Sequence, residues 1–198
     1  MIPPLIAVCF GVVLTLATSQ SVPGDPPARA AGNSGIAALF TPEIQFWGAS
    51  LNSWANAAGL DPNLAATIMQ IESCGDPAAH SSAGAAGLFQ VMPFHFLLDE
   101  DAYNPETNAQ RGLNYLRRAL DAAGGDTRLA LAGYNGGLGV ISRAEAGWPA
   151  ETRRYVYWGS GIYADAASLG GDSARLKEWL EAGGASLCRQ AHQRLGLP

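Results

Sequence analysis

The sequence lacks an excess of positive charge. It has 198 residues, with 12 Lys or Arg against 17 Asp or Glu, a formal net charge of −5 at pH 7 and a pI near 5.1. A nucleic-acid-binding domain needs clustered basic residues to contact phosphates, so nucleic acid is excluded as an expected partner. The length suits one domain with a full core, which we expect to act as a monomer.

The sequence is also poor in strand signals. Val and Ile are sparse after residue 20, and regular alternating runs of β-branched residues are missing. Ala and Gly dominate the small residues, a composition that favours helices joined by glycine turns. We therefore predict a mainly α protein.

Histidines are few and scattered. His80, His95 and His192 lie far apart, without the spacing of metal ligands. We predict no metal site and no cofactor.

The N-terminal segment resembles an export signal. An apolar run from Leu5 to Ala17 ends in small polar residues, although no Lys or Arg precedes it. The run is shorter than the roughly 20 residues of a spanning helix. We predict that residues 1–20 are a signal peptide or an N-terminal anchor and that the protein is exported to the periplasm or the cell exterior, touching a membrane only through this segment. Residues 21–40, rich in Pro and Gly, are predicted to be a flexible linker.

The three cysteines are Cys9, Cys74 and Cys188. Without Cys9, which lies in the export segment, an even pair remains in an oxidising compartment. This favours a disulfide between Cys74 and Cys188 over the alternative of two unrelated buried thiols.

Helix start and stop signals organise the rest of the chain. Capping residues, prolines at first helical positions and terminal glycines predict helices at residues 42–59, 62–75, 105–124, 126–136 and from 152 onward. Residues 81–92, with Gly84 and Gly87, are expected to form tight turns or a small hairpin. We predict one helical domain over residues 41–165 and a tail of short helices over 166–198 that packs on it.

Glu72 is the candidate general acid. It falls in the last turn of a predicted helix, with Met69 and Ala65 on its side. A carboxylic acid stays protonated near neutral pH only where its surroundings disfavour the charge, and the C-terminal end of a helix dipole disfavours an anion further. The alternative is an ordinary surface glutamate.

Three ordered blocks between residues 72 and 156 resemble a known family. The first is Glu72-Ser73, Asp76-Pro77, Ala79, Ser81, Gly84-Ala85, Gly87-Leu88, Gln90 and Met92-Pro93; the second is Ala132-Gly133-Tyr134-Asn135-Gly136-Gly137; the third is Glu151-Thr152-Arg153-Arg154-Tyr155-Val156. Their order and spacing resemble the soluble lytic transglycosylases of family 1, which share the goose-type lysozyme fold. The resemblance implies a lysozyme-like domain that acts on the glycan strands of peptidoglycan.

The resemblance also implies roles for single residues. Glu72 would be the only catalytic acid/base. The residues implied to bind the substrate are Ser81 and Gln90 in the glycan groove, Tyr134 and Asn135 near the scissile bond, and Tyr155 as a support from the later helix. Asp76 stands where the family usually has Asn; we interpret it as a turn residue before Pro77 rather than a second catalytic carboxylate.

Three functions remain open from the sequence. A lytic transglycosylase would cleave the β-1,4 bond between N-acetylmuramic acid and N-acetylglucosamine and close a 1,6-anhydro ring. A hydrolytic muramidase would use the same residues with water as the nucleophile. A non-catalytic wall-binding module would retain the glycan-binding groove without the activity. The presence of Glu72 argues against this alternative.

Overall fold

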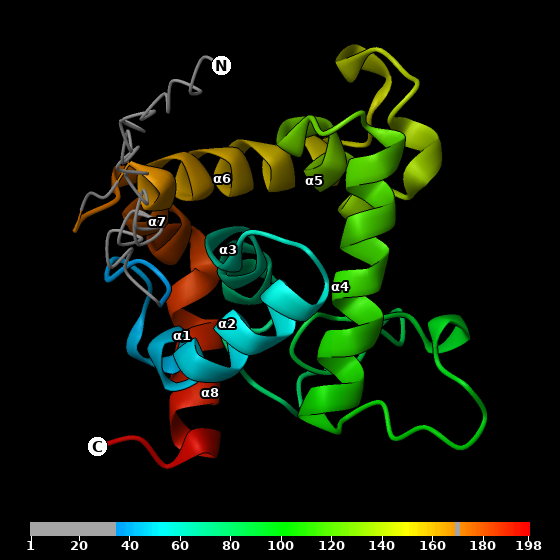
Figure 1. Cartoon of the computed structure of the whole chain (residues 1–198). Helices are drawn as coiled ribbons and strands as arrows, with labels where there is room; N and C mark the ends of the chain where they lie inside the picture. Colours follow the sequence, from blue (N-terminus) through cyan, green and yellow to red (C-terminus); the bar gives the residue numbers. More distant parts are fainter. Residues whose placement is uncertain (1–34, 169–170) are drawn as a thin grey trace, which may run out of the picture. The chain divides into compact units, whose positions relative to one another are not determined.

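Most of the chain is helical in the computed structural model, which describes residues 35–168 and 171–198 (Figure 1). The mainly α class is confirmed, since no β-strand occurs within those two ranges. The α-helices are α1 (Pro42–Phe46), α2 (Gly48–Ala57), α3 (Pro62–Glu72), α4 (Pro105–Ala122), α5 (Thr127–Gly136), α6 (Ala150–Ala167), α7 (Ala174–Trp179) and α8 (Ala185–Leu195). Shorter helical turns are η1 (Pro93–His95), η2 (Leu138–Val140), η3 (Glu145–Gly147) and η4 (Leu180–Gly184).

Helix α3 is the central element of the described helices. Every residue from Leu64 to Gln70 is buried, as expected of a helix that is covered on all sides. Helices α1, α2 and α6 pack directly against it (Figure 1). The end of α3, where Glu72 lies, is therefore anchored in the core.

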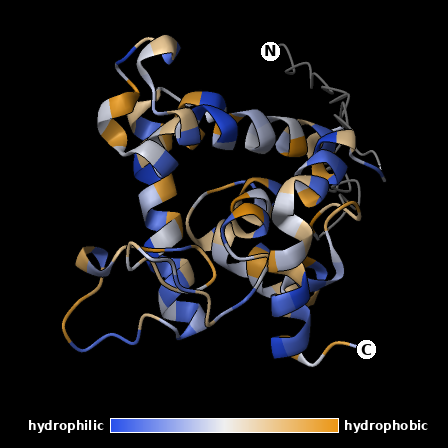
Figure 2. Cartoon of the chain, turned by 180° about the vertical axis from the view of Figure 1, so that it is seen from behind, coloured by the Kyte–Doolittle hydropathy of each residue, from blue (hydrophilic) through white to orange (hydrophobic). Residues whose placement is uncertain are grey.

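Three helices, α3, α4 and α5, begin next to the capping residues that predicted them, whereas α6 begins at Ala150, two residues before the predicted start. Asp61, Asn104 and Asp126 each accept a hydrogen bond from a backbone N–H in the first turn of α3, α4 and α5. Helix α4 alternates apolar and polar surface along its length (Figure 2), and its buried Leu113 and Leu116 face the core.

One predicted helix is divided in two. We expected a continuous helix over residues 42–59, but the chain breaks at Trp47, between α1 and α2. The Trp47 backbone leaves helical geometry, and its indole Nε1 donates a hydrogen bond to the Gly75 carbonyl at 2.9 Å. Thr41 makes no side-chain cap bond; its hydroxyl contacts the Cys74 sulfur at 3.4 Å.

The linker prediction is wrong at its C-terminal end. Ile36 and Phe40 are buried in the core, and the Ala37 N–H donates to the Asn63 side chain at 2.7 Å. Apolar contacts therefore hold residues 36–40 in place. The predicted export segment and the rest of the linker lie outside the described residues, and no helix in the described ranges combines the length and apolar character of a membrane span.

Residues 81–92 form turns joined by two isolated β-bridges, His80 with Ala86 and Ala86 with Val91. Buried Asn108 on α4 fixes this segment: it accepts a hydrogen bond from the Phe89 N–H and donates to the Ala86 and Ala102 carbonyls. Gly87 has φ +74°, and a Cβ there would collide with the Asn108 amide. Glycine is thus required at this position.

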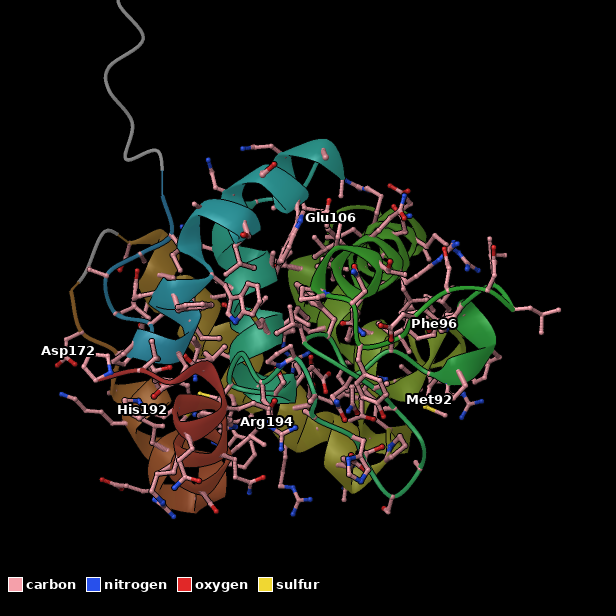
Figure 3. All side chains as sticks on the ribbon, turned by 90° about the horizontal axis from the view of Figure 1, so that it is seen from below. Met92, Phe96, Glu106, Asp172, His192 and Arg194 are labelled. Atoms are coloured by element: carbon pink, nitrogen blue, oxygen red, sulfur yellow. A yellow bond between two sulfur atoms is a disulfide. The ribbon has the colours of Figure 1, made fainter. Side chains whose placement is uncertain are left out.

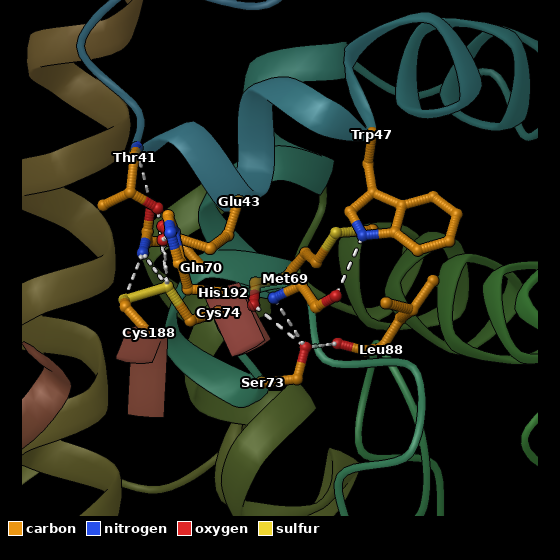
Figure 4. Close-up of a disulfide and its surroundings, with 11 residues drawn as sticks. Thr41, Glu43, Trp47, Met69, Gln70, Ser73, Cys74, Leu88, Cys188 and His192 are labelled. Atoms are coloured by element: carbon orange, nitrogen blue, oxygen red, sulfur yellow. Dashed lines mark hydrogen bonds and ion pairs between the residues drawn. A yellow bond between two sulfur atoms is a disulfide. The ribbon is translucent and has the colours of Figure 1, made fainter. Parts of the chain in front are cut away.

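The C-terminal helices fold back on the domain. A disulfide joins Cys188 on α8 to Cys74, two residues beyond Glu72 (Figure 4). This is the pairing that the cysteine count favoured. His192 and Arg194 lie on the same helix (Figure 3). His192 hydrogen-bonds the Glu43 carboxylate at 2.9 Å, and Arg194 lies 3.4 Å from Asp76.

The disulfide is predicted to stabilise the fold. The double variant Cys74→Ala/Cys188→Ala should lose about 2–4 kcal/mol in the free energy of unfolding, because the cross-link restricts a long loop in the unfolded chain. Urea denaturation measures this loss. Dithiothreitol should bring the wild type to the stability of the variant and leave the variant unchanged; a wild type of equal stability with and without reductant would contradict the prediction.

Asn108 is predicted to stabilise the turn segment. Asn108→Ala should lower the free energy of unfolding by about 2–4 kcal/mol, since it leaves buried backbone groups without partners. The matched control is Asn114→Ala, an exposed position on the same helix, which should change stability by no more than about 0.5 kcal/mol. Equal losses in the two variants, measured by the same denaturation, would refute this role.

Candidate active site

Glu72 is the last residue of α3, and its position is fixed by the residues that follow it. Ser73 leaves helical geometry and donates a hydrogen bond from its hydroxyl to the Leu88 carbonyl at 2.7 Å. The disulfide of Cys74 holds the next position. The end of the helix is therefore tied both to the turn segment and to α8 (Figure 4).

The Glu72 side chain is half-buried and lines a pocket of about 250 Å³. The residues around this pocket are Ile71, Glu72, Asn135, Glu151, Arg154, Tyr155, Trp158 and Trp179. They come from α3, α5, α6 and α7, so the three sequence blocks that predicted the site meet here at Glu72, Asn135 and Tyr155.

The pocket changes the acidity of Glu72. Its pKa is raised from the ordinary value of 4.5 to about 8, chiefly because burial disfavours the charged form. The nearby Tyr155 hydroxyl, a potential donor to the charged carboxylate, partly opposes this rise, and the Glu151 carboxylate adds to it by repulsion. Although the side chain is open to the pocket, enough of the carboxyl is desolvated to keep it protonated at neutral pH.

The Tyr155 hydroxyl faces the Glu72 carboxyl. It lies near enough to lower the pKa of Glu72, yet this buried oxygen has no hydrogen bond of good geometry to any described residue. Burial and the nearby carboxyl raise the pKa of Tyr155 well above its usual value, so the phenol stays neutral. A neutral hydroxyl in this position can donate a hydrogen bond to Glu72 when that group becomes a carboxylate.

Asn135 connects the site to a second pocket. Its side-chain oxygen accepts a hydrogen bond from the Thr152 hydroxyl at 2.8 Å, which joins the ends of α5 and α6. It also lines a neighbouring pocket of about 350 Å³. That pocket is lined by Gln90, Val91, Met92, Phe94, His95, Gly112, Tyr115, Tyr134, Asn135, Gly136 and Gly137.

Gln90 and Tyr134 lie in this second pocket. Gln90 has φ +46°, a left-handed conformation, and its side-chain amide donates to the Gly87 carbonyl at 3.0 Å. The Tyr134 hydroxyl donates to the Phe89 carbonyl at 2.7 Å. Both side chains are therefore held by the backbone of the turn segment beside the second pocket.

Ser81 lies outside both pockets. Its hydroxyl oxygen accepts a hydrogen bond from the Ala85 N–H at 3.0 Å, and its carbonyl accepts one from the Gly84 N–H. Ser81 therefore stabilises the turn and does not line either pocket.

The acidic neighbour of Glu72 is Glu151, not Asp76. Asp76 is buried, accepts a hydrogen bond from the Ala78 N–H and lies beside Arg194, as expected of a turn residue. Glu151 was quoted in the third block without a role. Glu151 and Tyr155 are four residues apart, a spacing that places both side chains on one face of α6. This spacing is the signal in the sequence that could have placed Glu151 at the site.

One group of candidate metal ligands occurs among the described residues, namely Glu43, Cys74 and Cys188. Both sulfurs belong to the disulfide. They are not thiolates and so do not offer a metal site.

The chain is similar to known transglycosylases. The family model described as "Transglycosylase SLT domain" matches residues 49–155, more than half of the chain. A protein named "Transglycosylase" of Enterobacteria phage PRD1 is 37% identical over 114 residues, which are 57% of this chain and 40% of that protein.

The fold has a solved relative as well. The lytic transglycosylase Slt of Pseudomonas aeruginosa, in an inactive mutant with one glutamate replaced by glutamine, matches with a TM-score of 0.51 and 26% identity. The match covers 62% of this chain and 24% of that one. This chain therefore spans less than half of either relative. With the three blocks gathered around Glu72, the family match shows that the chain belongs to the transglycosylase SLT domain family.

Proposed function

We propose that this protein is a lytic transglycosylase of peptidoglycan. It cleaves the β-1,4 bond between N-acetylmuramic acid and N-acetylglucosamine and leaves a 1,6-anhydro ring on the muramic acid. The observation that carries the proposal is the Glu72 carboxyl, with its pKa raised to about 8, in a pocket formed by the family's three sequence blocks. The names of the phage and Pseudomonas relatives support the reaction class.

Glu72 acts first as an acid. Protonated at neutral pH, it transfers its proton to the glycosidic oxygen while the bond from that oxygen to the anomeric carbon breaks. Positive charge develops at the anomeric carbon, and the substrate's own N-acetyl group takes the stabilising role that a second carboxylate has in most glycosidases. The Glu72 carboxylate formed in this step can be stabilised by the Tyr155 hydroxyl.

Glu72 acts next as a base. Its carboxylate removes the proton from the C6 hydroxyl of the muramic acid, and that oxygen bonds to the anomeric carbon to close the anhydro ring. The carboxyl is neutral again at the end of the cycle. One residue thus serves both steps, and no water enters the products.

Hydrolysis is the second candidate function, and the position of Glu151 near Glu72 favours it. This carboxylate lines the same pocket as Glu72. A second carboxylate near the acid is what a hydrolytic glycosidase uses to activate water. The exposed position of Glu151, solvated and outside the core, supports the single-acid scheme over this alternative.

We also infer that the protein works outside the cytoplasm. Peptidoglycan is assembled beyond the membrane, and a disulfide such as Cys74–Cys188 persists in oxidising compartments. Residues 1–20, the predicted export segment, lie outside the described residues.

The reaction is tested by mass spectrometry of the fragments released from purified peptidoglycan sacculi. The wild type should release products one water lighter than reducing-end species. Glu72→Gln should reduce release by about 10²- to 10⁴-fold, because it removes the transferable proton. The matched control is Glu181→Gln, an exposed change on the tail, which should keep full activity.

Each other result has a distinct meaning. Reducing-end products would make the protein a muramidase. Full activity of Glu72→Gln, with its fold verified by circular dichroism, would overturn the acid/base assignment. A wild type that binds sacculi without releasing fragments would identify a wall-binding module.

A further inference from the structure

The pocket around Glu72 extends beyond the segment that matches the family. The match ends at residue 155, and two residues that line this pocket, Trp158 and Trp179, follow it in the chain. Trp158 lies on α6, and Trp179 is the last residue of α7, in the C-terminal tail. None of the three sequence blocks contains Trp179, so the family resemblance does not explain why this ring lies at the pocket of the acid.

Helix α7 has a fixed place against α6 (Figure 1). The Ser173 hydroxyl caps α7 by accepting a hydrogen bond from the Leu176 N–H at 3.0 Å, and it donates to the Asp165 carboxylate on α6 at 2.6 Å. The Arg175 guanidinium lies 3.6 Å from the centre of the Tyr157 ring, also on α6. Polar and cation–π contacts therefore anchor the helix that carries the ring.

The Trp179 ring is also held from the side of the tail. A Cβ on Gly184 would collide with the six-membered part of the indole, so the chain leaves no free space there. A larger residue at position 184 would have to displace the ring. The indole is thus enclosed between the Glu72 pocket and the backbone of η4.

The low exposure of Trp179 separates its role from sugar binding. A ring that stacks on a sugar must present one face to the ligand, whereas this side chain is only 5% exposed. An aromatic side chain buries about 150–250 Å² of surface. At the wall of a pocket, such a ring occupies space that water would otherwise fill.

The groups that can carry charge around Glu72 come from α5 and α6. Glu151 and Arg154 of α6 line the pocket, and both are exposed. Tyr134 of α5 and Tyr155 of α6 are neutral, because burial raises the pKa of each well above its usual value. Helix α7 adds an indole to the lining and no charge. Burial outweighs Glu151 as the cause of the raised pKa of Glu72, so the exclusion of water from the pocket decides its acidity.

We propose that Trp179 is a positioning residue of the active site, whose indole forms the tail-side wall of the Glu72 pocket and keeps water away from the acid. The inference rests on the proposed function, because it takes Glu72 as the catalytic acid. It gives the C-terminal tail, which lies outside the family match, a part in catalysis. A chain that ended with the matched segment would keep all three blocks and have a more hydrated acid.

The test is a carbon-13 NMR titration of the Glu72 carboxyl in the full chain, together with the pH dependence of fragment release from sacculi. Trp179→Ala admits water, which solvates the carboxylate, so the midpoint should fall from about 8 by about one unit or more. The alkaline limb of the activity should move to lower pH with it, because Glu72 must be protonated to act. Trp179→Phe, which keeps an apolar ring, should bring both close to the wild type.

Leu176→Ala is the matched control. Leu176 is buried on the same helix and does not line the pocket. This variant should lower stability through the loss of apolar packing and leave the midpoint and the alkaline limb unchanged. Gly184→Ala perturbs the ring without removing it: the added methyl group displaces the indole, so the midpoint should fall in a chain that still has Trp179.

Three results would overturn the proposal. The first is a folded Trp179→Ala protein with the midpoint of the wild type. If that variant does not fold, an unchanged midpoint in Gly184→Ala is the second. The third is an equal fall in Leu176→Ala, which would assign the effect to a loosened tail rather than to the indole. A wild type that releases no fragments would instead contradict the proposed function, and the NMR midpoints would still decide the role of Trp179.

Discussion

The Glu72 carboxyl ends a helix that is buried from Leu64 to Gln70, and its low-polarity surroundings favour the neutral acid over the anion. This desolvation has a cost for folding. With a folded pKa of about 8 against an ordinary value of 4.5, the unfolded chain releases the proton more readily between these two pH values. The stability of the fold therefore falls as the pH rises through this window. The same property provides an acid that is protonated at neutral pH, so function and stability oppose each other at one residue.

Contacts between segments that are distant in sequence keep this acid in place. Ser73 and the disulfide of Cys74 fix the end of α3, and the bond from Thr152 to Asn135 joins the ends of α5 and α6. Asn108 holds the turn segment that borders the second pocket. The site thus depends on a framework of buried polar bonds as well as on apolar packing, and such a framework limits the positions available to the reacting groups.

Local signals in the sequence predicted the parts of the fold that depend on neighbouring residues. Caps such as Asp61 and Asn104 predicted where helices begin. The resemblance of the three blocks to a known family predicted that Glu72, Asn135 and Tyr155 lie at one site. The break at Trp47 could not be predicted, because it depends on the Gly75 carbonyl 28 residues away. Phe40 was assigned to a linker because its neighbours are rich in Pro and Gly, although its ring packs in the core.

Burial keeps Glu72 protonated at neutral pH, and a titration of that carboxyl would measure this property itself. Carbon-13 NMR of the protein labelled at glutamate side chains, with Glu72→Gln to assign the resonance, follows the carboxyl shift as the pH is raised. The midpoint for this one glutamate should lie near 8. A midpoint near 4.5, the value of an ordinary glutamate, would mean that the carboxyl is solvated and that burial does not keep it protonated.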